Sequence, residues 1–252
     1  MTVTDVNVVK SAIFERPDDA NKGTLGSLLC VCGSYGMAGA AVMSAKGALR
    51  TGIGLAKCAL PRSIYPIVAQ TILESVYYPL SENADGRISK VNIPFLVSES
   101  CKSSATLVGC GLGVCDDTLK IVFSLIENST TPLVLDADAL NCVAKQPKIL
   151  LRKKAQIIIT PHPGEMSRLT GLATPLVNAE RERVALDFAQ KYGVVTVLKG
   201  AGTVIASPNG KVLVNPTGNS GMATGGSGAV FTNSSEENEL VKSCRVHGMS
   251  PE

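Results

Sequence analysis

Two glycine-rich segments in this sequence can bring backbone N–H groups close to an anion. Asn215 to Phe231, "NPTGNSGMATGGSGAVF", holds five glycines with small hydroxyl residues between them. Lys199 begins a second small-residue turn in "LKGAGT". Successive N–H groups in such turns, or at the N-terminus of a following helix, bind phosphate and similar groups. We therefore expect two anion cradles in the C-terminal half of the chain.

A histidine between two prolines is the most specific candidate for a ligand contact. "TPHPGEM" places His162 between Pro161 and Pro163, with Glu165 entering the next helix. The proline rings restrict the backbone on both sides of the imidazole. A lone histidine is usually structural, but one that is held rigidly at a strand end favours ligand contact.

Three other segments follow predicted strands. "CGSYGMAGAA" and "GCGLGVCDD" contain glycines that let backbone approach a ligand, although tight strand-to-helix turns explain both about as well. "LDADALN" places Asp136 and Asp138 at a strand end. One of these carboxylates could cap the next helix while the other faces the cleft and organises water, Mg²⁺ or a polar ligand. Together the turns predict a phosphorylated or dinucleotide ligand, without identifying a reaction.

These segments can form one site only if the strands before them end at the same edge of a sheet. Short β-rich runs alternate with helical runs, which is typical of an α/β protein with a mostly parallel, doubly wound sheet. The predicted strands are 28–34, 54–60, 74–80, 105–111, 132–138, 156–162 and 194–200, followed by an antiparallel edge hairpin around "PNG" within 203–216. Ligands bind beyond the carboxyl ends of the strands in such sheets.

Two helices are predicted clearly. The first lies within "GMAGAAVMSAKGALRTG", where small apolar residues recur at helical spacing and Gly52 can end the helix. The second runs from Ala179 to Tyr192, with Asn178 as its N-cap and Gly193 as its terminator.

Composition excludes several classes of protein. The chain has 252 residues, a net charge of +3, no Trp and only 4% aromatic residues, which argues against nucleic-acid binding. Eight cysteines and two histidines form no C-x-x-C pair or zinc spacing, so we expect no metal site in the protein itself. No apolar run is long enough to cross a membrane, and the polar N-terminus does not resemble a signal peptide. We therefore expect a cytoplasmic protein with reduced cysteines.

The motifs together resemble the ADP- or ATP-dependent NAD(P)H-hydrate dehydratases of the ribokinase-like superfamily. The matching segments are "GSYGMAGAAVMSAKGALRTGIG", "GCGLG", "LVLDADALN", "ITPHPGEMSRLTG", "VVTVLKGAGTVI" and "NPTGNSGMATGGSG", in the order of the family. The resemblance covers about 22–228. It implies a ribokinase-like α/β fold with helices on both faces of the sheet.

The resemblance also implies a repair reaction on hydrated NADH or NADPH. The family phosphorylates the hydroxyl of the damaged nicotinamide ring with a nucleotide and then loses phosphate, which restores the double bond. By position, Ala40, Gly111 and His162 look like contacts to the hydrated dinucleotide. The residues that look like nucleotide contacts are Lys199, Gly200, Ala201, Gly202, Thr203 and Gly228.

Cofactor and partners follow from the same resemblance. Mg²⁺ is expected with the nucleotide. The sequence leaves ADP or ATP open, and prokaryotic members commonly use ADP. Homo-oligomers are expected from the family, and a separate epimerase would supply the S epimer of the substrate.

The chain departs from the family after Gly228. The family has an aspartate next, in "GSGD", as the expected base, and this chain has Ala229. Alanine cannot accept a proton through its side chain. We therefore expect a domain over 1–228 that is incomplete at its C-terminal end. We expect a divergent polar tail over 229–252 that looks truncated or frame-shifted. We also expect impaired activity. The alternatives are a non-catalytic nucleotide-binding relative and a ribokinase-like small-molecule kinase.

Overall fold

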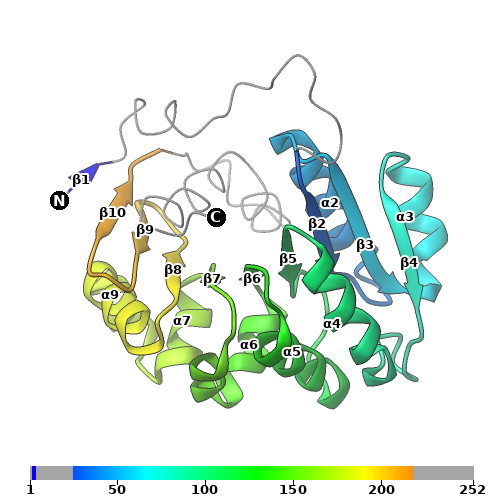
Figure 1. The fold of residues 1–252 in the computed structure, drawn as a ribbon. Coiled ribbons are helices and arrows are strands. Elements are labelled where there is room, and N and C mark those ends of the chain that lie inside the picture. Colours follow the sequence, from blue (N-terminus) through cyan, green and yellow to red (C-terminus); the bar gives the residue numbers. More distant parts are fainter. Residues whose placement is uncertain (1, 4–24, 218–252) are drawn as a thin grey trace.

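The protein forms one twisted ten-stranded sheet with helices packed on both faces (Figure 1). The computed structural model describes residues 2–3 and 25–217. Along the sheet the strand order is β1-β10-β9-β8-β7-β6-β5-β2-β3-β4. The seven strands from β4 to β8 in this order are mutually parallel, whereas β9 and β10 form an antiparallel hairpin. The predicted mostly parallel, doubly wound sheet is confirmed.

The strand bounds agree with the predicted runs to within a few residues. The strands are β1 (Thr2–Val3), β2 (Ser27–Val31), β3 (Leu55–Pro61), β4 (Val76–Leu80), β5 (Ala105–Val108), β6 (Leu133–Leu135), β7 (Ile157–Ile159), β8 (Val195–Leu198), β9 (Thr203–Ala206) and β10 (Val212–Asn215). The predicted hairpin is β9–β10, and the two-residue β1 pairs with the outer side of β10.

Helices connect the parallel strands, because successive parallel strands need a crossover connection. The α-helices are α2 (Ala38–Thr51), α3 (Tyr65–Thr71), α4 (Ile93–Lys102), α5 (Asp116–Asn128), α6 (Asp138–Lys145), α7 (Pro163–Thr170), α8 (Thr174–Ala179) and α9 (Arg181–Tyr192). Short 3₁₀ turns are η1 (Arg62–Ile64), η2 (Lys90–Asn92) and η3 (Pro147–Arg152).

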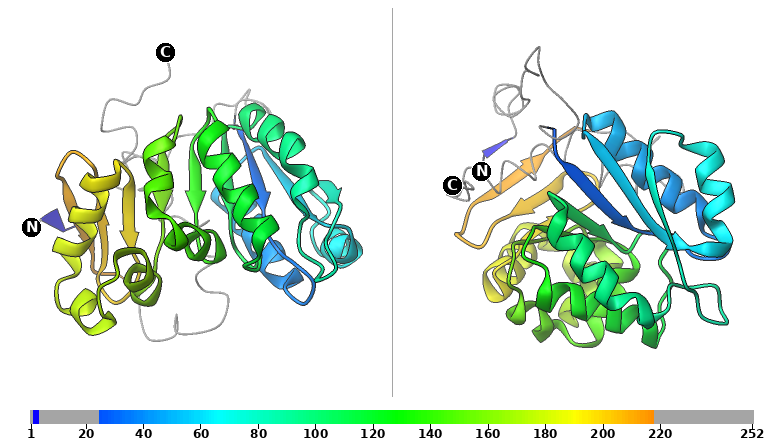
Figure 2. Two further views of the ribbon diagram at one scale, coloured as in Figure 1. Left: turned by 90° about the horizontal axis from the view of Figure 1, so that it is seen from below. Right: turned by 45° about the vertical axis from the view of Figure 1, so that its right-hand side comes forward.

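The two faces of the sheet carry separate hydrophobic clusters. Leu29 and Val31 of β2 pack with α4 to α9, whereas Leu28 and Cys30 of the same strand pack with α2 and α3. This division follows from the alternation of side chains along a strand. Figure 2 shows the helices on both sides of the sheet, which confirms the predicted two-faced arrangement.

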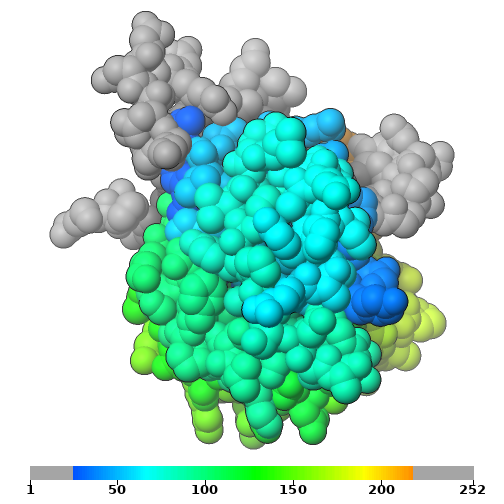
Figure 3. Space-filling view, turned by 90° about the vertical axis from the view of Figure 1, so that its right-hand side faces the viewer, coloured from blue at the N-terminus to red at the C-terminus, as the bar shows by residue number. Residues whose placement is uncertain are grey.

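The end of the sheet formed by β4 carries exposed apolar side chains. Figure 3 faces this end of the molecule, where the cyan segment with α3 and β4 forms much of the surface. Leu73 and Ile67 are 83% and 57% exposed there. Within the described part of the chain, no helix is long and apolar enough to cross a membrane.

One predicted helix boundary is wrong. Asn178 lies inside the short helix α8, and α9 begins at Arg181 after Glu180. Pro175, in the first turn of α8, fits the start of a separate helix because its missing N–H is not needed there. The predicted helix ends are confirmed, since Gly52 and Gly193 both adopt the left-handed conformation directly after α2 and α9.

Candidate functional site

The predicted site residues within the described part of the chain lie in turns or first helical turns after β2, β5, β6, β7 and β8, except Thr203, which begins β9. Because these strands are parallel neighbours, their carboxyl ends lie at the same edge of the sheet. The order of the turns along that edge follows the order of the strands. The segment after β7 therefore lies between those after β6 and β8.

Ala40 and Gly111, the two predicted substrate contacts with the smallest side chains, lie against each other. A Cβ atom on Gly111 would lie 2.7 Å from the Ala40 Cβ. The buried hydroxyl of Ser34 donates a hydrogen bond of 2.8 Å to the Gly111 carbonyl oxygen, which joins the turns after β2 and β5. Gly111 has a φ of 64°, which favours glycine, and the close contact with Ala40 leaves no room for a side chain.

His162 forms the N-cap of α7, which is the structural role that the sequence left open. Its Nδ1 accepts hydrogen bonds from the backbone N–H groups of Gly164 and Glu165, at 3.0 and 3.3 Å. In return, Glu165 Oε2 accepts from the His162 backbone N–H at 2.8 Å, which completes a capping box. Because Nδ1 is an acceptor here, the neutral ring carries its proton on Nε2. The side chain is 51% exposed, so this N–H remains within reach of a ligand as well as of Glu165.

The turn from Lys199 to Thr203 lies beside the His162 segment. The Lys199 backbone N–H donates a hydrogen bond of 2.8 Å to the Pro161 carbonyl oxygen. Within the turn, the Thr203 hydroxyl donates to the Gly200 carbonyl oxygen at 3.0 Å. Gly200 and Gly202 have φ values of 147° and 66°, which L-residues with a Cβ rarely adopt. This conformation explains the two glycines of "LKGAGT".

Arg181 holds this turn from α9, although no motif in the sequence predicts that role. Its Nη2 donates to the Leu198 carbonyl oxygen at 2.8 Å, and a Cβ atom on Gly200 would lie 2.9 Å from its Nη1. Burial lowers the pKa of Arg181. Nothing in the local pattern distinguishes this arginine from Arg183, two residues later, because only the packing of α9 on β8 and β9 decides which one faces the turn.

A cluster of buried charges lies beneath His162 and the turn. Lys199 Nζ lies 2.6 Å from Asp136 Oδ1, and only 3% of the Asp136 side chain is exposed. Glu165 is also buried. Burial raises the pKa of Glu165, the positive charge of Lys199 opposes that rise, and the charge of Asp136 adds to it. The sequence placed Asp136 at this edge, but it did not predict its partner.

Asp138 has a different role from the predicted helix cap. Asp138 is the first residue of α6, and the N-cap position is Ala137. Asp138 Oδ2 accepts from the Gly113 backbone N–H at 2.8 Å, and Oδ1 accepts from the Asn141 side chain at 3.3 Å. The expectation that one of the two aspartates caps α6 is therefore wrong, because Asp136 binds Lys199 and Asp138 fixes the turn after β5.

The remaining predicted site residues lie outside the described residues. These are Gly228, Ala229 and the rest of the glycine-rich stretch from 218 onward. Among the described residues, no group of three or more histidine, cysteine, aspartate or glutamate side chains is arranged to hold a metal ion.

Comparison with known protein families supports the motif-based resemblance. The family model described as NAD(P)H-hydrate dehydratase matches residues 28–234. The bifunctional NAD(P)H-hydrate repair enzyme Nnr of Moorella thermoacetica is 38% identical over 88% of this chain. The match covers 42% of that relative, so this chain spans about two fifths of its length. The ADP-dependent (S)-NAD(P)H-hydrate dehydratase of Bacillus subtilis is 31% identical over 89% of this chain and 76% of its own length.

Solved structures share the same fold. The crystal structure of the ADP/ATP-dependent NAD(P)H-hydrate dehydratase from Bacillus subtilis, co-crystallized with ATP/Mg²⁺, superposes with a TM-score of 0.80 and 29% identity. The superposition covers 98% of this chain and 87% of that chain. A ribokinase-like superfamily protein from Enterococcus faecalis matches with a TM-score of 0.77 at 21% identity, over 92% and 77% of the two chains, which supports the fold. The chain belongs to the NAD(P)H-hydrate dehydratase family.

Proposed function

We propose that this chain binds ADP or ATP together with the S epimer of hydrated NADH or NADPH, and that its fold is built to dehydrate that substrate to NAD(P)H. The observation that carries the proposal is the contact between the two motif segments. The Lys199 N–H donates to the Pro161 carbonyl oxygen at 2.8 Å, so the turn that we assign to the nucleotide lies directly beside His162, which we assign to the substrate. A reaction that moves a phosphoryl group between two ligands requires such neighbouring sites.

The residues of this chain supply binding and orientation. Ala40 and Gly111 present small side chains and backbone to the hydrated dinucleotide. His162 can donate from Nε2 to a polar group of the same ligand. Within the turn from Lys199 to Thr203, the N–H groups of 200–202 face the nucleotide, where fixed dipoles stabilise phosphate charge without reorganisation.

The reaction balances in two steps. The substrate hydroxyl oxygen attacks the terminal phosphorus, its proton leaves to a base, and the nucleotide departs with one phosphoryl group fewer. The C–O bond then breaks, phosphate takes the bonding electron pair, and a proton leaves the neighbouring carbon as the double bond forms. The product is the reduced dinucleotide.

Nucleotide and Mg²⁺ fit the described residues in different ways. The 199–203 turn fits a nucleotide, because the positive φ values of Gly200 and Gly202 allow a tight turn whose backbone carries no side chain at these two positions. Since the described residues offer no cluster of three metal-ligating side chains, we propose that Mg²⁺ arrives with the nucleotide, bound mainly by its phosphates and water. Bound there, the ion would neutralise the charge of the phosphates.

The base is the missing part of this proposal. Ala229 stands at the family's aspartate position, and we propose that this substitution impairs turnover while leaving nucleotide binding. The domain boundary at 228, a homo-oligomeric assembly, a cytoplasmic location and a separate epimerase that supplies the S epimer are further proposals from the same family relationship.

The test compares the native chain with Ala229→Asp and Ala229→Asn, each with ADP and with ATP, by following recovery of the reduced dinucleotide from its hydrate. We expect Ala229→Asp to exceed the native rate by about 10²–10⁴-fold, since that is the typical contribution of a general base. Ala229→Asn is the matched control, because asparagine has the same shape but cannot accept the proton. Nucleotide binding with no turnover in any of the three chains would contradict the dehydratase proposal and support the non-catalytic relative.

A further inference from the structure

A buried ion pair connects the nucleotide turn to a strand two positions away in the sheet. Lys199 follows β8 and Asp136 follows β6, with β7 between them. Two strand spacings are about 10 Å, so the long lysine side chain must cross the end of β7 to reach the carboxylate. Lys199 Nζ and Asp136 Oδ1 lie 2.6 Å apart, with 15% and 3% of the two side chains exposed.

The ends of the three strands are joined by backbone hydrogen bonds as well. The Thr160 N–H donates to the Leu135 carbonyl oxygen at 3.2 Å, and the Lys199 N–H donates to the Pro161 carbonyl oxygen at 2.8 Å. The ammonium of Lys199 therefore crosses a segment to which its own backbone is already bonded. As a result, the first residue of the turn is fixed at both its backbone and its side chain.

A largely buried ion pair of this kind is weak evidence for a role in stability, which leaves room for another role. Removing two charges from water costs several kcal/mol per ion, and an apolar pair of similar volume is often at least as stable. Lys199 faces two carboxylates, because Glu165 also interacts with it electrostatically. The positive charge of Lys199 thus opposes the repulsion between the charges of Asp136 and Glu165.

We propose that Asp136 is a positioning residue for the nucleotide. By holding Lys199 Nζ, it directs that ammonium into the protein and fixes the 199–203 turn in the conformation that receives the nucleotide. The inference rests on the proposed function, because it assumes that this turn binds ADP or ATP. Asp136 acts through Lys199 and is not assigned a contact with the ligand.

A second ion pair among the described residues serves as a matched control. Lys57 Nζ on β3 lies 2.7 Å from Glu99 Oε1 on α4, with 12% and 11% of the side chains exposed. This pair resembles the first in length and is also largely buried, but it joins β3 to α4 and not to the turn. Glu99→Gln therefore reports the general effect of breaking a largely buried ion pair.

The experiment measures ADP binding calorimetrically, with Mg²⁺, for the native chain, Asp136→Asn, Lys199→Met, the double variant and Glu99→Gln. We expect each single variant at the pair to weaken ADP binding by about tenfold, equivalent to about 1.4 kcal/mol. The double variant should lose about as much as either single variant, because the two residues act as one unit. Glu99→Gln should bind ADP within about twofold of the native chain, whatever its melting temperature.

A second measurement needs no ligand. Amide hydrogen exchange at Lys199, whose N–H donates to the Pro161 carbonyl oxygen, should be faster in Asp136→Asn than in the native chain and unchanged in Glu99→Gln, because only the first variant releases the start of the turn. Unchanged exchange in Asp136→Asn, or equal loss of ADP affinity in Glu99→Gln, would overturn the inference. If the native chain binds neither ADP nor ATP, the proposed function fails, and the exchange comparison still decides whether Asp136 fixes the turn.

Discussion

Gly109, at the end of β5, lies so close to Asp136 that a Cβ atom on the glycine would be 1.9 Å from the Asp136 carbonyl oxygen. The two turns are also joined by a hydrogen bond of 3.3 Å from the Asp138 N–H to the Gly109 carbonyl oxygen. Between these aspartates, Ala137 is the only non-glycine residue in 2–3 and 25–217 with a positive φ, at 48°. The turn that positions Asp136 is therefore strained, and direct backbone contact with β5 supports it.

This contact predicts that Gly109→Ala is strongly destabilising. Gly109 has a φ of 124°, and any side chain there meets backbone that cannot move aside cheaply. We expect Gly109→Ala to lower the free energy of unfolding by about 3 kcal/mol or more, measured by denaturant titration. Gly36→Ala is the control, because Gly36 has a φ of 81° but no atom within 4 Å of its Cβ position, and we expect it to cost about 1 kcal/mol. Equal losses would show that strain and not contact determines the effect.

Arg181 should matter more than its neighbour on the same helix. Arg181→Met leaves the buried Leu198 carbonyl oxygen without its donor, so we expect unfolding free energy to fall by about 1–3 kcal/mol and ADP binding to weaken. Arg183→Met removes a side chain that is 63% exposed and that, within the described residues, forms an ion pair only with Glu180. We expect that control to change stability by about 0.5 kcal/mol at most. Denaturant titration and calorimetric ADP binding of both variants test this, and the reverse order would contradict it.

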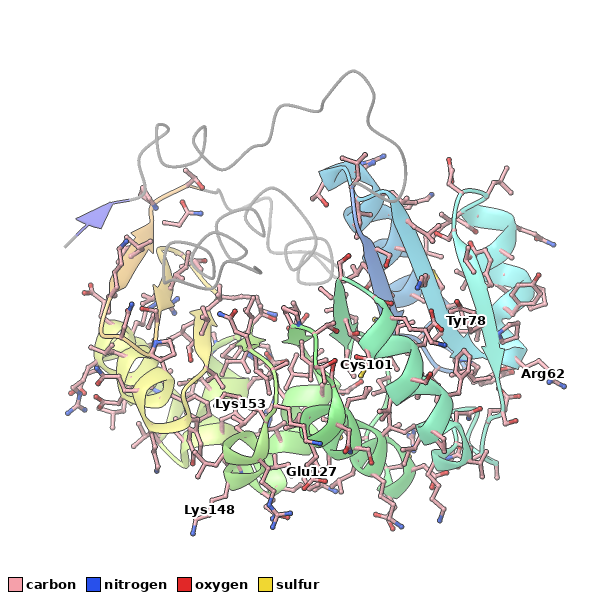
Figure 4. All side chains as sticks on the ribbon, in the orientation of Figure 1. Arg62, Tyr78, Cys101, Glu127, Lys148 and Lys153 are labelled. Atoms are coloured by element: carbon pink, nitrogen blue, oxygen red, sulfur yellow. The ribbon has the colours of Figure 1, made fainter. Side chains whose placement is uncertain are left out.

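The pair between Lys57 and Glu99 should make stability depend on pH. The hydrogen bond and positive charge of Lys57 lower the pKa of Glu99 below 4.5, although burial partly opposes them. Because the folded pKa lies below the unfolded one, the stabilisation is present above pH 4.5 and is lost as the pH falls through the folded value. Tyr78, labelled in Figure 4, donates to the same carboxylate at 3.2 Å.

We therefore expect Glu99→Gln to lower the unfolding free energy by about 1–3 kcal/mol at neutral pH, with the difference from the native chain shrinking in acid. Glu127→Gln serves as the control, because its partner Arg152 is 67% exposed and such surface pairs contribute about 0–1 kcal/mol. A difference for Glu99→Gln that stays constant from neutral pH into acid would exclude the assigned ion pair as its cause.

Cys115 should react with a thiol reagent before the buried cysteines. Burial opposes ionisation there, but hydrogen bonds from the hydroxyl and N–H of Thr118 and the N–H of Asp117 outweigh it and lower the pKa of Cys115. Burial raises the pKa of Cys58 and of Cys142 to about 11. Since the thiolate is the reactive form, timed alkylation with peptide mass spectrometry should label Cys115 ahead of both. Earlier labelling of Cys58 or Cys142 in the folded chain would be the opposite result, and Cys115→Ser identifies the peptide.

Much of the fold follows from local patterns. The strand runs and the left-handed glycines after α2 and α9 were predicted because short apolar runs and glycine terminators act within a few residues. The start of α9 was not predicted correctly. Asn178 is a residue type that often caps helices, but the same residue type can also lie inside a short helix. Only the packing of α8 separates the two cases.

The sequence alone determined the alternation of strands and helices, the small residues at 40 and 111, the prolines around His162 and the presence of alanine at 229. These are properties of residue type and local spacing. The tertiary structure decided the strand order, and with it that Lys199 meets Asp136 from 63 residues away and that Arg181 and not Arg183 holds the turn. Long-range pairs of this kind have no local signal, because each depends on which strand ends become neighbours when the sheet forms.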